Sequence, residues 1–159
     1  MNGELAMTLT ARHKKAGGFR KLVNSLETTA PDKRAKILDS LRVEDPEFVA
    51  DVEKCIFSFD EFGAIGDMII AEIISSLSDG EIRSLAFALY KGDEALREKF
   101  KKNMTPKQFL VFREADEAIL QLKLSEKLGG QFKIVEKARI LESQSKFNLK
   151  RYNPKYPDF

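Results

Sequence analysis

Histidine and cysteine, the residues that most often bind transition metals or assist nucleophilic catalysis, each occur only once in this chain. With His13 the only histidine and Cys55 the only cysteine, we expect no zinc cluster, no Cys–His pair in an ordered core and no Ser–His–Asp set. Cys55 lies in the apolar run Cys55-Ile56-Phe57. That setting is typical of a small buried thiol in a reducing compartment.

Other catalytic patterns are also missing from the sequence. The glycines form neither GxGxxG nor GxxxxGK[ST], so no phosphate-binding loop is predicted. The adjacent acids Glu44-Asp45 and Asp60-Glu61 stand at expected helix starts, where carboxylates cap backbone N–H groups, so we interpret them as caps rather than as a catalytic pair. We therefore expect no enzyme activity, no cofactor, no metal and no small-molecule substrate.

The most informative charges lie on a helix expected from Thr105 to about Gln121. With a step of about 100° per residue, five polar side chains share one third of its circumference. We call these residues the charged ridge: Lys107, Arg113, Glu114, Glu117 and Gln121. The apolar residues of this helix point elsewhere, mostly inward: Phe109, Phe112, Ala115, Ile119 and Leu120. The ridge is either a solvated helix face or a surface for a partner of complementary charge.

Composition limits the kinds of partner that this chain can bind. The 159 residues include 27 Lys and Arg against 25 Asp and Glu, a net charge of +2, so no strong field gathers nucleic acid. The apolar stretch from Met68 to Leu77 is too short for a membrane helix, which needs about 20 residues. The basic residues near the amino terminus follow a short mixed segment, which is the wrong order for a signal peptide. These features predict a cytoplasmic protein.

Helical patterns position these side chains and predict an all-α fold. Apolar residues recur at helical spacing in the first clear helix: Phe19, Leu22, Val23 and Leu26. Pro31 opens a second helix, and Asp45-Pro46-Glu47 opens a third. Three short helices over residues 19–56 have the size of an armadillo-like repeat unit. One such unit cannot bury both of its faces, so we expect it to stack on something.

Further start signals and breaks define the expected domains. Ser78 with Glu81, and Thr105 with Gln108, predict two capping boxes. Glycines between residues 60 and 66 favour a boundary, and the prolines near the carboxy terminus favour an extended end. We predict an amino-terminal arm or linker helix over 1–16, an armadillo-like unit over 17–59, a helical unit over 60–146 and an extended tail over 147–159.

Several motifs occur in the order and spacing of one known family. They are Gly17-Gly18-Phe19-Arg20, Glu44-Asp45-Pro46-Glu47, Ile56-Phe57-Ser58-Phe59, the segment 85–92 (LAFALYKG) and the segment 96–105 (LREKFKKNMT). Together they resemble the carboxy-terminal region of the FliG family of bacterial flagellar motor switch proteins, over about residues 17–143. The resemblance implies an armadillo-like unit followed by a six-helix unit. It also implies hinges at Gly17-Gly18 and at Ile56-Phe57-Ser58-Phe59.

The resemblance further implies a function in which the chain transmits torque by electrostatic contact with a stator. By position, the stator-binding residues are Lys91, Lys107, Glu114 and Lys123. The family has two successive acids on this helix, whereas here the second place is Ala115. The next acid, Asp116, is turned away from the charged ridge by the helical phase.

The implied partners are the cytoplasmic loop of a MotA-like stator, other rotor or switch proteins, and a neighbouring FliG subunit bound through residues 19–56. The implied location is cytoplasmic and peripheral at the inner membrane, through the flagellar basal body. Three alternatives stay open: a FliG-like adaptor that binds a different partner through the helical-repeat face, the helical cytosolic domain of a magnesium transporter, and a nucleic-acid binder. The sequence favours the last two least, because it has no membrane segment and its bases are interleaved with acids.

Overall fold

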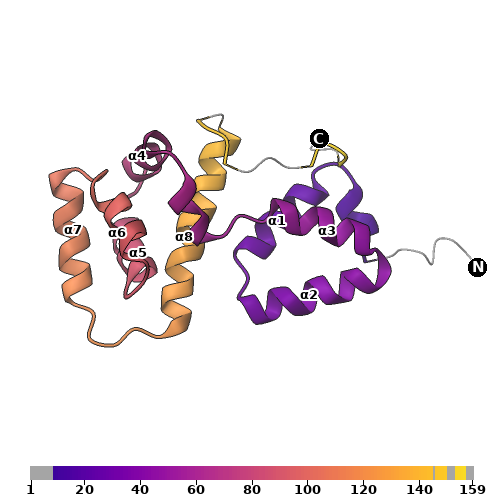
Figure 1. Cartoon of the computed structure of the whole chain (residues 1–159), viewed down its shortest axis with the longest axis horizontal. Helices are drawn as coiled ribbons and strands as arrows, with labels where there is room; N and C mark the ends of the chain where they lie inside the picture. The colour runs from indigo at the N-terminus through magenta and orange to yellow at the C-terminus, as the bar shows by residue number, and fades with distance from the viewer. Residues whose placement is uncertain (1–8, 145, 150–152, 157–159) are drawn as a thin grey trace, which may run out of the picture. The chain divides into compact units, whose positions relative to one another are not determined.

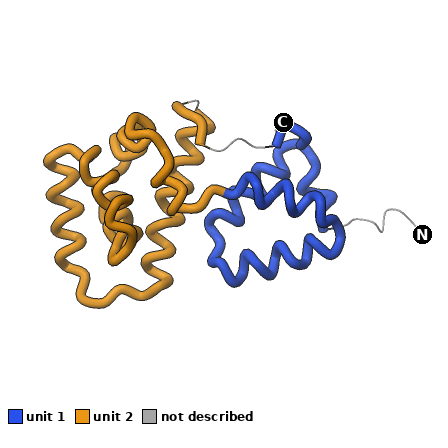
Figure 2. The backbone as a smooth tube through the Cα atoms, viewed as in Figure 1, with its two compact units in different colours: residues 1–56, 150–159 blue, residues 57–149 orange. Residues whose placement is uncertain are grey.

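The computed structural model describes residues 9–144, 146–149 and 153–156. The chain forms two compact units (Figure 2). Unit 1 contains Met1–Ile56 and Lys150–Phe159, and unit 2 contains Phe57–Leu149. The regular elements of the described residues are all helical, which confirms the predicted all-α class. None of these helices has the length and apolar character needed to cross a membrane.

Among its described residues, unit 1 has three α-helices and a preceding 3-10 helix (Figure 1). These elements are η2 (Ala11–Lys14), α1 (Gly18–Glu27), α2 (Pro31–Glu44) and α3 (Pro46–Cys55). Proline occupies the first position of α2 and of α3 as predicted, where its missing N–H leaves no hydrogen bond unmade. Asp45 caps α3 by accepting a hydrogen bond of 3.0 Å from the backbone N–H of Phe48.

The predicted apolar stripe of α1 forms the centre of the unit 1 core. Its four members are all buried: Phe19, Leu22, Val23 and Leu26. They pack with residues of α2 and α3: Leu38, Leu41, Phe48, Val49, Val52 and Cys55. Burial of each large apolar side chain contributes about 1.5–3 kcal/mol. Cys55 is buried in this core, as its apolar context predicted.

The expected amino-terminal arm packs on unit 1 in its described part. The backbone N–H of Leu9 donates to Glu44 across 2.8 Å, and Lys14 forms an ion pair of 2.5 Å with Asp45. Between these contacts the chain forms only the short 3-10 turn η2, instead of the longer helix considered for residues 1–16. Residues 1–8 of that predicted arm lie outside the described residues.

Unit 2 contains one 3-10 helix and five α-helices among the described residues: η3 (Phe59–Ala64), α4 (Asp67–Ser75), α5 (Asp79–Leu89), α6 (Glu94–Lys101), α7 (Pro106–Glu117) and α8 (Leu124–Ser143). Both predicted capping boxes are present. The Ser78 and Glu81 pair spans 2.9 and 3.2 Å at the start of α5, and the Thr105 and Gln108 pair spans 3.1 Å in both directions at the start of α7.

Helix α5 lies between α7 and α8 and contacts both. Gly130 of α8 allows the close approach, because a Cβ atom there would lie 2.4 Å from the carbonyl oxygen of Ser84 on α5. The preceding Gly129 faces open space. The glycine pair therefore has one packing position and one exposed position. The core of this unit includes Phe62, Ile73, Leu85 and Ile134, which are fully buried.

The boundary between the units falls three residues earlier than the sequence suggested. Phe57 and Phe59 are buried in the unit 2 core, where their rings lie 4.8 and 5.6 Å from that of Phe62. Ile56 instead packs against the unit 1 core. The expected extended tail over 147–159 also divides differently: residues 153–156 lie in unit 1 and contain a turn.

Candidate partner-binding surface

Helix α7 is fixed to unit 2 by its amino terminus and its inner face. Besides its part in the capping box, the Gln108 side chain donates a hydrogen bond of 2.9 Å to the carbonyl oxygen of Ile74. Phe112 is 1% exposed, and the Arg97 guanidinium lies 5.1 Å from the centre of its ring. The opposite face of α7 is therefore held outward.

The outward face carries four members of the charged ridge, all of them exposed: Lys107, Arg113, Glu114 and Glu117. Lys107 and Glu114 are two turns apart, about 10.5 Å along the helix axis. Arg113 and Glu117 approach to 3.9 Å, as their spacing predicted. Both side chains of that pair are solvated, so the pair adds little stability. The ridge thus presents charges of both signs to a partner.

Two predictions about the end of this helix are wrong. The helix ends at Glu117, and Gln121 lies in the segment that leads to α8. Leu120, expected to point mostly inward, is 95% exposed. The cause is local, because the chain leaves the helix at Ala118 and the helical phase no longer applies beyond that residue.

Lys91 and Lys123 belong to one part of the unit 2 surface although they are far apart in sequence. Lys91 lies in the turn after α5 with a φ of 49°, which is left-handed and uncommon for a residue with a side chain. Lys123 is the residue before α8, and its backbone N–H donates a hydrogen bond of 3.2 Å to Glu126. Both lysines line one shallow hollow together with Lys127. This hollow has a basic rim.

An apolar groove adjoins the basic hollow. It has a volume of about 660 Å³ and lies between α5, α7 and the segment 118–122. Its apolar lining includes Phe87, Val111, Ile119 and Leu122, and its charged lining consists of Arg83, Glu114 and Glu126. Leu120 to Leu122 line both the groove and the hollow. The two therefore form one continuous surface.

The structure brings three of the four predicted stator-binding residues to this surface. Lys91 and Lys123 line its basic part, and Glu114 lines its apolar groove. Lys107 lines neither part, since it lies near the amino-terminal end of α7. Sequence reasoning missed Lys127 and the groove. The apolar run from Ala118 to Leu120, which follows the last charged turn of α7, is the sequence feature that could have indicated the groove.

The residues predicted as hinges take defined positions. Gly17 has a φ of 78°, a left-handed conformation that glycine adopts without strain. A Cβ atom on Gly18 would lie 2.5 Å from the carbonyl oxygen of Arg12, so glycine is needed there for close packing. The backbone N–H of Ser58 donates a hydrogen bond of 2.7 Å to Glu61. Phe57 and Phe59 are buried in the unit 2 core, whereas Ile56 packs against the unit 1 core, so the predicted hinge segment is divided between the two units.

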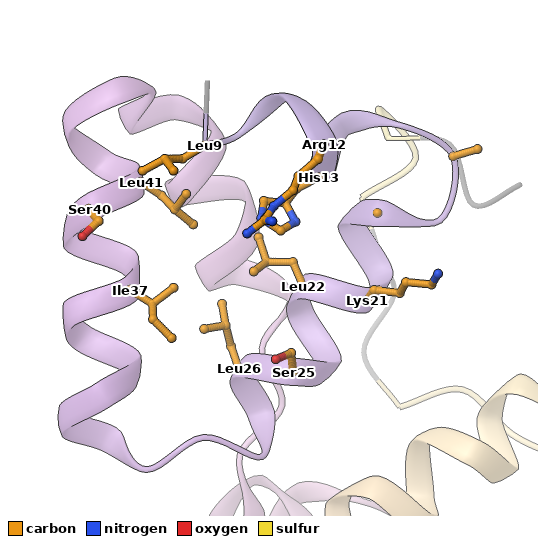
Figure 3. Close-up of a pocket in the computed structure, with 12 residues that line it drawn as sticks. Leu9, Arg12, His13, Lys21, Leu22, Ser25, Leu26, Ile37, Ser40 and Leu41 are labelled. Carbon is orange, nitrogen blue, oxygen red and sulfur yellow. The ribbon is translucent and has the colours of Figure 1, made fainter. Parts of the chain in front are cut away.

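Unit 1 has a separate hollow of about 670 Å³ between η2, α1 and α2. Leu22 and Leu26 of α1 face Ile37 and Leu41 of α2 across it (Figure 3). His13 lies at its edge, and burial, followed by the neighbouring Arg12, lowers the pKa of His13 below the ordinary value. Among the described residues, no cluster of His, Cys, Asp and Glu could hold a metal ion.

A family model described as the FliG C-terminal domain matches residues 39–149. The chain belongs to this family. Among curated relatives, the flagellar motor switch protein FliG of Borreliella burgdorferi is 28% identical over 93% of this chain and 42% of its own length. The FliG of Bacillus subtilis is 24% identical over 93% of this chain and 43% of its own length. The chain thus spans about two fifths of these FliG proteins.

Solved FliG structures share the fold. The full-length FliG of Aquifex aeolicus aligns with a TM-score of 0.53 and 27% identity, over 84% of this chain and 41% of that one. A fragment of FliG from H. pylori aligns with a TM-score of 0.59 and 18% identity, over 91% of this chain and 69% of that one. The expected FliG resemblance is confirmed. FliG is a motor switch protein and not an enzyme, in agreement with the sequence analysis.

Proposed function

We propose that this chain is a rotor component of a flagellar motor switch and that it transmits torque by electrostatic contact with a stator. Membership of the FliG C-terminal domain family supports a role in the switch. In this proposal the contact residues are Lys91, Lys107, Glu114 and Lys123. The partner is the cytoplasmic loop of a MotA-like stator. The chain works in the cytoplasm, peripheral to the inner membrane at the flagellar basal body.

The observation that carries the proposal is the separation of charge on the continuous surface of unit 2. Lys91, Lys123 and Lys127 lie around the basic hollow, whereas the adjoining groove carries the two acids Glu114 and Glu126 and the base Arg83. A stator segment would match this pattern with acids over the hollow and bases over the groove. Contacts between exposed charges form quickly and release readily, which suits a motor that repeats each contact.

Binding of the stator loop at low and high salt tests the proposal. Lys107→Glu and Glu114→Lys each reverse one exposed charge and should weaken binding about 3–10-fold at low salt, with a smaller effect at high salt. Lys133→Glu and Glu136→Lys reverse exposed charges on α8 that are not among the proposed contact residues, so they are matched controls and should leave binding unchanged. Equal losses in the two sets of variants would refute the assignment of these contact residues.

A second candidate function is a FliG-like adaptor that binds a different partner through the helical-repeat face, residues 19–56. The hollow between α1 and α2 favours this reading, because apolar side chains line an open space there. A neighbouring FliG subunit is the partner that the family suggests for the same face. An adaptor of this kind should bind its partner equally well after charge reversal at Lys107 and Glu114. A substitution in the hollow, such as Ile37→Asp, should abolish binding.

A further inference from the structure

The carboxy-terminal turn of this chain is bound to one face of unit 1. Tyr156 is 9% exposed, and its ring stacks on that of Phe19 with the centroids 4.4 Å apart and the planes 8° apart. The Phe48 ring completes the slot, nearly perpendicular to the Tyr156 ring and with the two centroids 5.4 Å apart. Phe19 belongs to α1 and Phe48 to α3, so a tyrosine from the far end of the sequence contacts both helices.

Polar contacts give this slot a specific ligand chemistry. The Tyr156 hydroxyl donates a hydrogen bond of 2.7 Å to Asp51 on α3. Lys155 lies 3.1 Å from Glu47 and 3.7 Å from Asp51. Burial, and then the bond to Asp51, raise the pKa of the Tyr156 phenol, so the hydroxyl stays a donor at neutral pH. The slot therefore matches an aromatic ring with a hydroxyl donor and an adjacent cation.

The turn that carries Lys155 and Tyr156 has its own internal hydrogen bonds. The side chain of Asn153 accepts a hydrogen bond of 3.0 Å from the backbone N–H of Lys155, which is an Asx-type turn. The backbone N–H of Tyr156 donates a hydrogen bond of 3.2 Å to the carbonyl oxygen of Asn153. A turn of this kind holds Lys155 and Tyr156 in the bound shape and lowers the entropic cost of docking.

The chain just before the turn is anchored on unit 2. The backbone N–H of Leu149 donates a hydrogen bond of 2.7 Å to the Glu142 carboxylate. The other oxygen of that carboxylate lies 2.8 Å from the Arg139 guanidinium in a mostly buried ion pair. Phe147 and Leu149 also pack against the unit 2 core. Because three residues separate Leu149 from Asn153, the chain cannot extend beyond about 14 Å between their Cα atoms.

We propose that the α1/α3 slot of unit 1 is a binding site for a tyrosine-bearing turn and that the chain's own residues 153–156 are its ligand. The docked turn is a second tether between the units, in addition to the peptide bond from Ile56 to Phe57. While the turn is docked, the units can reorient only as far as the short link allows. Release of Tyr156 leaves a single flexible connection. This inference does not depend on the proposed stator contact.

A distance measurement on the full chain tests the tether. Spin labels at Lys36→Cys on α2 and Glu136→Cys on α8 occupy exposed positions, one in each unit, while Cys55 is buried. In this background we expect Tyr156→Ala to broaden the distribution of label distances. Tyr156→Phe, which keeps the ring stack and loses the bond to Asp51, should broaden it less. Tyr90→Ala removes a tyrosine from unit 2 and should leave the distribution unchanged.

A peptide added in trans distinguishes binding in the α1/α3 slot from the restraint that the covalent link imposes on the two units. A synthetic peptide of residues 146–159 should bind the Tyr156→Ala chain and slow hydrogen exchange of α1 and α3, but it should not restore the narrow distance distribution. Helicity that matches the parent chain will show that the variants fold. An equally narrow distribution in Tyr156→Ala would overturn the proposal. So would a parent chain that sediments as a dimer through exchange of its tails.

Discussion

Arg97 of α6 donates a hydrogen bond of 2.5 Å to Asp116 of α7, and the two side chains are only 16% and 25% exposed. The same guanidinium lies over the ring of Phe112. Asp116 is therefore engaged inside unit 2 and faces away from the charged ridge, as the helical phase predicted. Of the two successive positions 114 and 115, only Glu114 supplies an acid to the outer face of α7.

The pair of Arg97 and Asp116 should contribute measurably to the stability of unit 2. Replacement of Asp116 by Asn leaves the mostly buried Arg97 guanidinium without its charged partner, which should cost about 1–2 kcal/mol in the free energy of unfolding. Urea denaturation measures this loss. Glu117→Gln is the control, because it breaks only the exposed pair with Arg113 and should cost less than about 0.5 kcal/mol. Equal costs would show that burial of the Asp116 pair has no energetic effect.

The two neighbouring glycines of α8 should respond in opposite directions to alanine. Gly130→Ala places a methyl group 2.4 Å from the carbonyl oxygen of Ser84 and should destabilise unit 2 by about 1–3 kcal/mol, because α5 and α8 must separate. Gly129→Ala enters open space within a helix and should stabilise it by about 0.5–1 kcal/mol. Thermal unfolding compares the two variants, and a stabilising Gly130→Ala would contradict the close packing.

The stability of unit 1 should fall at acid pH through Asp45. The hydrogen bond from Lys14, and then that from the Phe48 N–H, hold the pKa of Asp45 below its ordinary value of 3.8. A lowered folded-state pKa gives stability that is present above the unfolded pKa and is lost as the pH falls through the folded value. Urea unfolding at neutral pH and near pH 3 should show the loss.

The Asp45 variants separate its charge from its cap. Asp45→Asn can still accept a hydrogen bond from the Phe48 N–H. Because Asn does not titrate, the contribution of residue 45 to the free energy of unfolding should no longer change between neutral pH and about pH 3. Asp45→Ala removes the cap as well and should cost about 1 kcal/mol at neutral pH. NMR titration of the Asp45 carboxyl group gives the pKa directly, and a value at or above the ordinary one would contradict this account.

Gly18 should prove to be a packing position. Gly18→Ala places a methyl group 2.5 Å from the carbonyl oxygen of Arg12 and should displace η2 from α1, at a cost of about 1–3 kcal/mol. The His13 amide donates a hydrogen bond of 3.0 Å to the carbonyl oxygen of Thr10. Faster hydrogen exchange at this amide would indicate that η2 has been displaced. Gly66→Ala is the control, since its methyl group meets no atom within 4 Å and its φ is −64°.

The sequence by itself determined the helices and their starts. Proline at the first turn, Asp45 as a cap and the Thr105 and Gln108 capping box are local signals, because each acts within about four residues. The apolar spacing of α1 also identified its buried face. Helix ends were harder to predict, since α7 could have continued past Glu117 on local preferences alone.

Tertiary structure decided which distant residues meet. No local pattern brings Lys91 and Lys123 to one hollow, because that hollow exists only when α5 and α8 pack together. No local pattern places Tyr156 on Phe19, since that contact closes a loop of nearly the whole chain and depends on a slot that α1 and α3 form together. Local preferences therefore specified the helices. The hollow and the slot arose only when the helices packed together, because no helix can bury its apolar face alone.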